Sequence, residues 1–184
     1  MPELDDGESP GTASSTGGVI ARAQAGDRMA FGRLIEEHYE LIFRTAFKWS
    51  GTRSDAEDIT QEVCVKLAAN LGSFDGRSAF STWLYRVTLN TVRDLQRQQG
   101  RRGRQEGALK LVSPEDHPPD QEEAATMSQL WRAVRKLPER QRDAVLLVYA
   151  EDLSHAEAAA IMGCREATVS WHIFEAKRAL KGLL

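Results

Sequence analysis

Apolar residues recur every three to four positions in each periodic segment of this chain, and this spacing constrains the fold most. Residues three and four apart share one face of an α-helix, whereas a half-buried strand alternates every second residue. Near the C-terminus, for example, the spacings +4, +3 and +4 join Val169, Ile173, Ala176 and Leu180. No segment shows convincing strand alternation, and glycine and proline fall mostly between the periodic runs. The sequence therefore predicts an all-α protein.

The first half of the chain contains three such segments. The first ends at the break SGTRSD, and one of its faces comprises Phe31, Leu34, Ile35, His38, Ile42, Ala46 and Trp49. The second, about 55–71, follows a capping-box pattern formed by Ser54 and Glu57, and its inward residues are Ala56, Ile59, Val63, Leu67 and Leu71. The third, about 80–99, has as inward residues Phe80, Trp83, Leu84, Val87, Thr91 and Leu95. We expect 1–18 to be a disordered tail and 19–99 to be one helical domain.

Glycines, prolines and blocks of charge mark residues 100–121 as a flexible linker. Residues 122–184 then form a second domain, with a helix near 122–136 and a new helix that starts at Pro138. A second capping box pairs Ser154 with Glu157, and Gly163 ends that short helix. A short capped helix, a turn and a longer helix make a helix-turn-helix. The predicted fold is thus two small helical domains joined by a flexible linker, the C-terminal one a helix-turn-helix.

Composition and motifs argue against several classes of protein. The chain has 184 residues, of which 41% are hydrophobic and 28% charged, which is typical of a globular protein. No apolar run approaches the roughly 20 residues of a membrane helix, and the N-terminus lacks the features of a signal peptide, so we expect a cytoplasmic protein. We expect Cys64 and Cys164 to be free. We also expect no metal, no cofactor and no enzymatic activity, because the sequence has no zinc-site spacing, no phosphate loop and no nucleophile elbow.

The net charge of −3 is unevenly distributed. Residues 73–112 carry eight basic and three acidic side chains, and residues 132–184 carry nine basic and seven acidic. The stretch 113–131 between them has five acidic and no basic residues. Two basic regions separated by an acidic one favour two modules that face nucleic acid, although ordinary solvated surface charge is the alternative.

The outward face of the third helix is the first candidate site. Its residues Arg86, Asn90, Arg93 and Arg97 are spaced +4, +3 and +4, and Arg101, Arg102 and Arg104 follow. Guanidinium groups in a row match a row of phosphates, and the amide between them can contact a base edge. The preceding loop contains Phe74, Arg77 and Phe80, a combination suited to stacking single-stranded bases. The alternatives are a merely solvated arginine face and phenylalanines that anchor the loop.

Two further faces are candidates. Along the second helix, Asp55, Asp58 and Glu62 form an acidic stripe beside Gln61 and Val65, suited to a basic protein surface or simply solvated. On the last helix, the face opposite the apolar stripe comprises Thr168, Trp171, His172, Glu175 and Arg178, and Arg165 precedes it. In a helix-turn-helix this face enters the major groove of DNA. The side chain of Trp171 could instead pack against a protein partner.

These segments together resemble bacterial sigma factors of the extracytoplasmic-function (ECF) group. The resemblance rests on DAEDITQEVCVKL (55–67), FSTWLYRVTLNTVRD (80–94), LPERQRDAVLLVY (137–149) and LSHAEAAAIMGCREATVSWHIFEAKRAL (153–180). It implies that 19–99 is sigma region 2 and 122–184 is region 4. It also implies that the acidic stripe with Gln61 and Val65 binds the clamp helices of RNA polymerase core. It further implies that Arg77 and the Arg86–Arg97 stripe contact the −10 element, and that the last helix contacts the −35 element.

The resemblance further implies promoter DNA and an anti-sigma factor as partners, and no membrane contact. The chain departs from the family pattern at Thr168–His172, where relatives often have T-V-K-S-R, and at VTLN (87–90), where IARN is more usual. Two other functions remain open from the residues alone. A helix-turn-helix regulator without polymerase would explain residues 132–184, and a helical adaptor that never contacts DNA would explain the acidic stripe.

Overall fold

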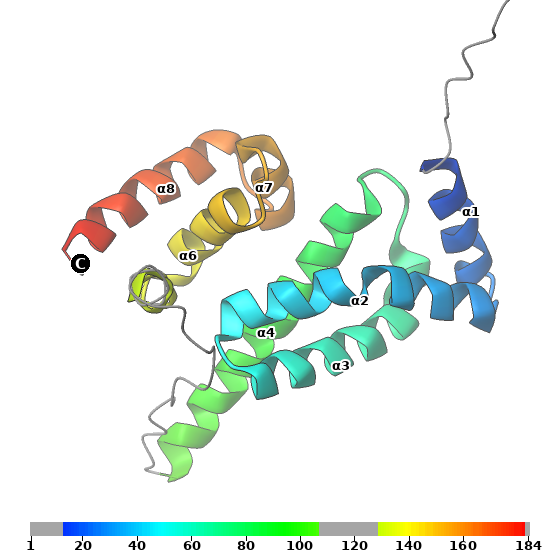
Figure 1. Cartoon of the computed structure of the whole chain (residues 1–184), viewed down its shortest axis with the longest axis horizontal. Coiled ribbons are helices and arrows are strands. Elements are labelled where there is room, and N and C mark those ends of the chain that lie inside the picture. The colour runs from blue at the N-terminus through cyan, green and yellow to red at the C-terminus, as the bar shows by residue number, and fades with distance from the viewer. Residues whose placement is uncertain (1–12, 107–128, 183–184) are drawn as a thin grey trace, which may run out of the picture.

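The computed structural model describes residues 13–106 and 129–182, and the side chains within 13–15 and 101–106 are not described (Figure 1). The N-terminal unit contains four α-helices, α1 (Ala13–Gln24), α2 (Arg28–Ser50), α3 (Arg53–Asn70) and α4 (Phe80–Glu106), and a 3-10 turn at Leu71–Ser73. The C-terminal unit contains a helical stretch at 129–135, then α6 (Glu139–Val145), a π-helical turn (Leu146–Ala150), α7 (His155–Met162) and α8 (Glu166–Lys181). No strand occurs in these residues, so the all-α prediction is confirmed.

The first helix starts within the segment predicted to be a disordered tail. Helix α1 begins at Ala13, and Ile20 on its inner face is buried against α2. This burial supplies the apolar contact that a disordered tail would lack. Residues 1–12 lie outside the described part of the chain. Asp27 then caps α2, because its Oδ1 accepts from the backbone N–H groups of Met29 and Ala30 at 2.9 and 3.0 Å.

Helix α3 starts two residues earlier than the sequence indicated. Its N-cap is Thr52, whose Oγ1 accepts from the N–H of Asp55 at 3.1 Å, so Ser54 already lies inside the helix and the prediction of Ser54 as N-cap was wrong. Gly51 permits this start, because its φ of 84° is one that other residues rarely adopt. The predicted inward residues of α3 are all buried.

Helix α4 is longer and more deeply buried than predicted. It continues to Glu106, so the first residues of the predicted linker are helical, and residues 107–121 lie outside the described part. Tyr85, Leu89 and Val92 are buried, whereas Trp83, Val87 and Leu95, which were predicted to face inward, are half-buried. The burial is wider because α4 contacts α7 of the C-terminal unit as well as α2 and α3.

The helix-turn-helix forms as predicted. Ser154 and Glu157 make a reciprocal capping box at the start of α7, and Gly163 ends α7 with a left-handed φ of 65°. Val169, Ile173 and Ala176 of α8 are buried, which fixes the opposite side of α8 as the outer face. Pro138 precedes α6 as its N-cap.

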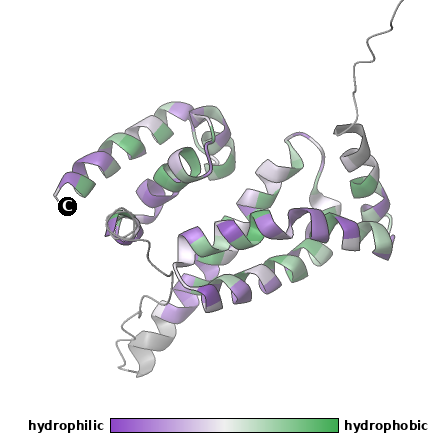
Figure 2. Cartoon of the chain, in the orientation of Figure 1, coloured by the Kyte–Doolittle hydropathy of each residue, from purple (hydrophilic) through white to green (hydrophobic). Residues whose placement is uncertain are grey.

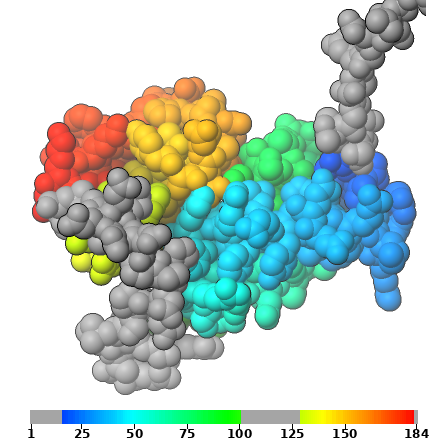
Figure 3. Space-filling model, in the orientation of Figure 1, coloured from blue at the N-terminus to red at the C-terminus, as the bar shows by residue number. Residues whose placement is uncertain are grey.

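The buried apolar residues of the two units form one continuous cluster. Figure 2 shows the hydrophobic positions on the facing sides of neighbouring helices. In the space-filling view, the C-terminal unit lies directly against the N-terminal unit (Figure 3). Within residues 13–106 and 129–182, no helix combines the length and the apolar character needed to cross a membrane.

Candidate functional site

The acidic stripe of α3 forms an exposed face with an apolar residue in it. Asp58, Gln61 and Glu62 are exposed, and Val65 beside them is 64% exposed. Asp55 is set apart from this face, because its carboxylate accepts from Thr52 Oγ1 at 2.9 Å and from Gln99 Nε2 at 3.2 Å. An exposed aliphatic side chain among carboxylates is suited to a protein partner and unsuited to DNA, which acidic groups repel.

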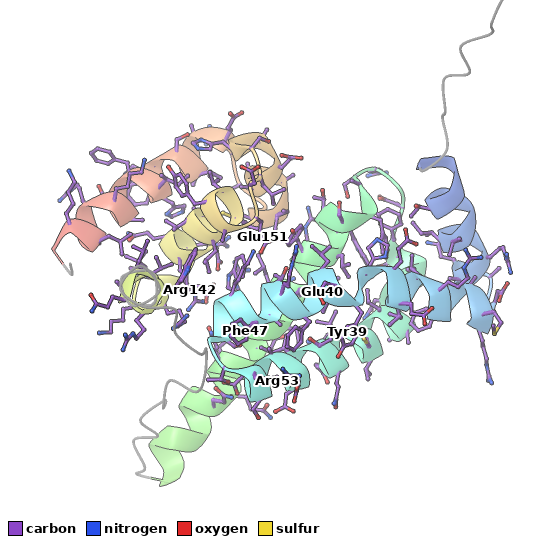
Figure 4. The ribbon with its side chains drawn as sticks, in the orientation of Figure 1. Tyr39, Glu40, Phe47, Arg53, Arg142 and Glu151 are labelled. Carbon is purple, nitrogen blue, oxygen red and sulfur yellow. The ribbon has the colours of Figure 1, made fainter. Side chains whose placement is uncertain are left out.

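An aromatic ladder on α2, made of Tyr39, Phe43 and Phe47, was missed by the sequence reasoning. Successive rings stack with centroids 6.5 Å apart. The guanidinium of Arg53 lies 6.0 Å from the centre of the Phe43 ring, and its Nε pairs with Glu57 at 2.8 Å. Figure 4 shows Tyr39, Phe47 and Arg53 along the α2–α3 side of the molecule. The signal available in the sequence was the spacing of aromatic residues four apart.

The residues of the basic stripe of α4 differ in their partners. Asn90 and Arg97 are exposed, as predicted. Both contact residues of their own helix: Asn90 Oδ1 accepts from Arg93 Nη1 at 3.3 Å, and Arg97 Nη1 lies 3.8 Å from Asp94 Oδ1. Arg86, although exposed, donates from Nη2 to the carbonyl oxygen of Ala160 on α7 at 2.7 Å. The side chain of Arg93 is only 13% exposed, because it bonds to Asp143 and its Nε lies 3.0 Å from Glu139 Oε1. The C-terminal unit therefore contacts two of the four residues of the stripe, Arg86 and Arg93.

The loop before α4 separates its predicted residues. Arg77 is highly exposed and pairs with Asp75 at 3.2 Å. Phe80 is buried, with its ring centre 5.2 Å from that of Phe74 and 5.6 Å from that of Trp83. Phe80 thus anchors the loop, while Arg77 remains accessible. The side chains of Arg101, Arg102 and Arg104 lie outside the described part.

A second group of polar contacts joins the two units at Glu151, which follows the π-helical turn. Its carboxylate accepts from Lys48 Nζ at 2.7 Å and from the Tyr85 hydroxyl at 2.8 Å, and its side chain is 2% exposed. Burial, followed by the hydrogen bond to this carboxylate, raises the pKa of Tyr85. Lys48 also donates to the carbonyl oxygen of Ala150 at 2.7 Å. Glu151 and Arg142 lie on the side of the C-terminal unit that faces α2 (Figure 4).

The outer face of α8 is rotated from the predicted one. Trp171 is 56% exposed, and with Arg165 and Thr168 it lines a shallow depression. His172 and Glu175, which we expected on the outer face, are only partly exposed, because α8 packs against α6 as well as α7. Burial and the nearby charge of Arg140 lower the pKa of His172, and its Nδ1 is buried without a hydrogen-bond partner.

Aromatic residues missed by the sequence reasoning extend the outer face of α8. Phe174 is 59% exposed, and Tyr149 is 55% exposed with the Lys177 ammonium 5.3 Å from its ring centre. Arg178, predicted on this face, is exposed and pairs with Glu175 at 3.0 Å. The aromatic and basic groups accessible on this face suit contact with base methyl groups and phosphates.

The two cysteines lie in different units. Cys64 is on α3 and Cys164 is in the turn between α7 and α8, and both are free and half-buried. Burial raises the pKa of the Cys64 thiol. Free cysteines agree with the prediction from the sequence.

Comparisons with known proteins agree with this arrangement. The model for sigma-70 region 2 matches residues 34–102, and that for sigma-70 region 4 matches residues 127–180. The chain is 33% identical over 175 residues to the ECF RNA polymerase sigma-E factor of Escherichia coli K12, covering 88% of this chain and 90% of the relative. It is 34% identical over 176 residues to the RNA polymerase sigma-H factor of Pseudomonas aeruginosa, with the same coverage.

The comparison with solved structures also finds sigma factors. The sigma factor RpoE of Bartonella quintana, in complex with the anti-sigma factor NepR, is similar with a TM-score of 0.69 at 25% identity, covering 83% of this chain and 95% of that one. CnrH, in complex with the cytosolic domain of CnrY, is similar with a TM-score of 0.65 at 25% identity, covering 90% and 94%. The chain belongs to the ECF group of the sigma-70 family of RNA polymerase sigma factors.

Proposed function

We propose that this sigma factor divides promoter recognition and polymerase binding among three faces. The face of α3 around Asp58, Glu62 and Val65 binds core polymerase. The exposed stripe of α4 contacts the −10 element, with Asn90 reading a base and its arginines holding phosphates. Helix α8 enters the major groove of the −35 element. As a sigma factor the protein is an initiation factor and not an enzyme. The role of these faces is therefore to recognise core polymerase and promoter DNA.

The observation that carries the proposal is the separation of chemistries. The face of α3 around Val65 exposes the carboxylates of Asp58 and Glu62. The stripe of α4 exposes arginines and the amide of Asn90, and the outer face of α8 exposes the aromatic rings of Trp171 and Phe174. DNA repels the first set and attracts the second. A regulator without polymerase would leave the first set without a role, and an adaptor that never contacts DNA would leave the second set without one.

An anti-sigma factor completes the set of proposed partners. The two solved structures described above are both complexes with another protein, named as an anti-sigma factor in the case of NepR. The outer face of α8 offers such a partner two exposed aromatic side chains, Trp171 and Phe174. With these proposed partners, we propose that the protein acts in the cytoplasm.

Transcription reconstituted with core polymerase and a library of genomic promoter fragments tests the proposal. Asp58→Arg with Glu62→Arg should abolish co-elution with core polymerase through like-charge repulsion. The matched control reverses two other exposed acids, Glu37→Arg with Glu40→Arg, and should co-elute. Unchanged co-elution of the folded Asp58/Glu62 variant would refute the polymerase assignment.

The same assay tests both DNA assignments. Asn90→Ala should relax the base preference at the −10 element, while Gln98→Ala, which removes an exposed amide of the same helix, should not. Trp171→Ala should weaken selection at the −35 element, while Met29→Ala, which removes an exposed apolar side chain of α2, should not. Wild-type promoter preference in Asn90→Ala or Trp171→Ala would contradict the corresponding assignment.

A further inference from the structure

We propose that the shallow depression on the outer face of α8 is a pocket for the 5-methyl group of thymine. Through it, this sigma factor reads part of its −35 element by apolar contact. The inference rests on the proposed entry of α8 into the major groove. The occupant is the edge of a thymine in duplex DNA, and the side chain that decides specificity is Trp171. The residues that line the depression are Arg165, Ala167, Thr168 and Trp171.

The depression lies on the part of α8 that would come nearest to the bases. Its lining residues fall between Arg165, the N-cap of α8, and Trp171 in the second turn of the helix. In a helix-turn-helix the N-terminal residues of the second helix contact base edges in the major groove. Because Val169 and Ile173 on the opposite side are buried, this side of α8 faces away from the protein. The depression is therefore where a base edge would arrive.

The lining residues have the chemistry that a methyl group needs. Most of the exposed lining is apolar, and none of the described residues in it is acidic. Ala167 and Thr168 each carry a methyl group, and the exposed indole of Trp171 adds a flat apolar surface. Alanine, the threonine methyl and phenylalanine typically contact the thymine methyl, and indole is a larger aromatic ring of the same kind. Thymine alone among the four DNA bases presents a methyl group in the major groove, so such a pocket distinguishes it from the others.

Several hydrogen-bonding side chains of α8 have partners within the protein. The hydroxyl oxygen of Ser170 lies 2.9 Å from Nδ1 of His155 on α7. Glu175 pairs with Arg178 at 3.0 Å, and His172 is only partly exposed. These side chains are less available for hydrogen bonds with base edges, which leaves more of the recognition to apolar contact.

Holoenzyme reconstituted from the full-length chain and core polymerase tests the pocket. The probe is the genomic promoter fragment that wild-type holoenzyme selects most strongly. Each thymine of its −35 region, on both strands, is replaced in turn by deoxyuridine, which removes the methyl group and keeps every hydrogen-bonding group. The variant is Trp171→Ala. The matched control is Phe174→Ala, which removes an exposed aromatic side chain one turn further along α8, outside the lining of the depression.

We expect at least one deoxyuridine substitution to lower the affinity of wild-type holoenzyme about fourfold, the factor that corresponds to one buried methyl group. At that position 5-bromodeoxyuridine should restore the affinity, because bromine is close to a methyl group in size. The same deoxyuridine should leave the affinity of Trp171→Ala holoenzyme unchanged and should lower that of Phe174→Ala holoenzyme by the wild-type factor. An effect of the missing methyl group on the shape of the duplex itself would lower the affinity of all of these proteins alike.

Two results would overturn the pocket. In the first, no deoxyuridine lowers wild-type affinity although Trp171→Ala weakens selection at the −35 element, and Trp171 then contacts the DNA backbone or a protein. In the second, the full deoxyuridine effect persists in Trp171→Ala. If Trp171→Ala holoenzyme binds too weakly to measure, Thr168→Ser decides, because it removes one methyl group from the lining and should reduce the deoxyuridine effect. A wild-type holoenzyme indifferent to the −35 sequence would instead refute the proposed role of α8 together with the pocket, so the two failures are distinguishable.

Discussion

Replacing Gly163 by alanine tests how the turn of the helix-turn-helix is held. Gly163 has a φ of 65°, and its N–H and that of Cys164 both donate to the Ala159 carbonyl oxygen. A Cβ built on Gly163 would meet nothing within 4 Å, so the cost is confined to the backbone. A left-handed residue with a Cβ costs about 1–2 kcal/mol, and the less flexible unfolded chain returns about 0.4–1 kcal/mol. We expect a net loss of about 1 kcal/mol.

Urea unfolding of the full-length protein, followed by circular dichroism, measures this loss. Gly163→Asn is the control, because asparagine tolerates the left-handed conformation, and it should lose less stability than Gly163→Ala. Gly51→Ala should lose a similar amount, because its φ is 84° and its Cβ would meet only the movable end of the Arg135 side chain. Equal stability of Gly163→Ala and the wild type, or a loss above about 3 kcal/mol, would refute a cost of backbone strain alone.

Two further predictions concern buried polar groups. The pKa of His172 is lowered by burial and by Arg140, so the folded protein binds fewer protons than the unfolded chain, and stability should fall as the pH drops below about 6.5. His172→Gln should flatten this dependence in urea midpoints measured across that range; an unchanged slope would contradict it. Tyr85→Phe removes a donor to the buried Glu151 and should cost about 1–2 kcal/mol in urea unfolding. A loss below about 0.3 kcal/mol would mean that water replaces the hydroxyl.

Signals confined to a few neighbouring residues predicted the fold well. The Ser154–Glu157 capping box and Gly163 each depend on contacts within one helical turn, and both formed as expected. The start of α3 shows the limit of such signals. Thr52 and Ser54 each precede an acidic residue by three positions, and only the extended backbone at Thr52 decides between them.

The candidate faces were harder to predict because tertiary contacts decide which side chains are free. The spacing of Arg93 places it in the stripe, but its engagement depends on Asp143, fifty residues away in the sequence. Likewise, His172 lies one position from the exposed Trp171, yet contact between α8 and α6 withdraws it from the surface. Periodicity identified the helices and the faces that they bury within their own unit. It could not show that another helix packs on the opposite face.

The continuous cluster of buried side chains across the two units has a thermodynamic consequence. Helices that share one apolar interior lose their packing together, so neither unit has a melting temperature of its own. Differential scanning calorimetry of the full-length protein should record a single heat-absorption peak, with equal calorimetric and van't Hoff enthalpies. Core polymerase that pulled the units apart would then divide one cooperative molecule into two, each stabilised by its own contacts with the enzyme.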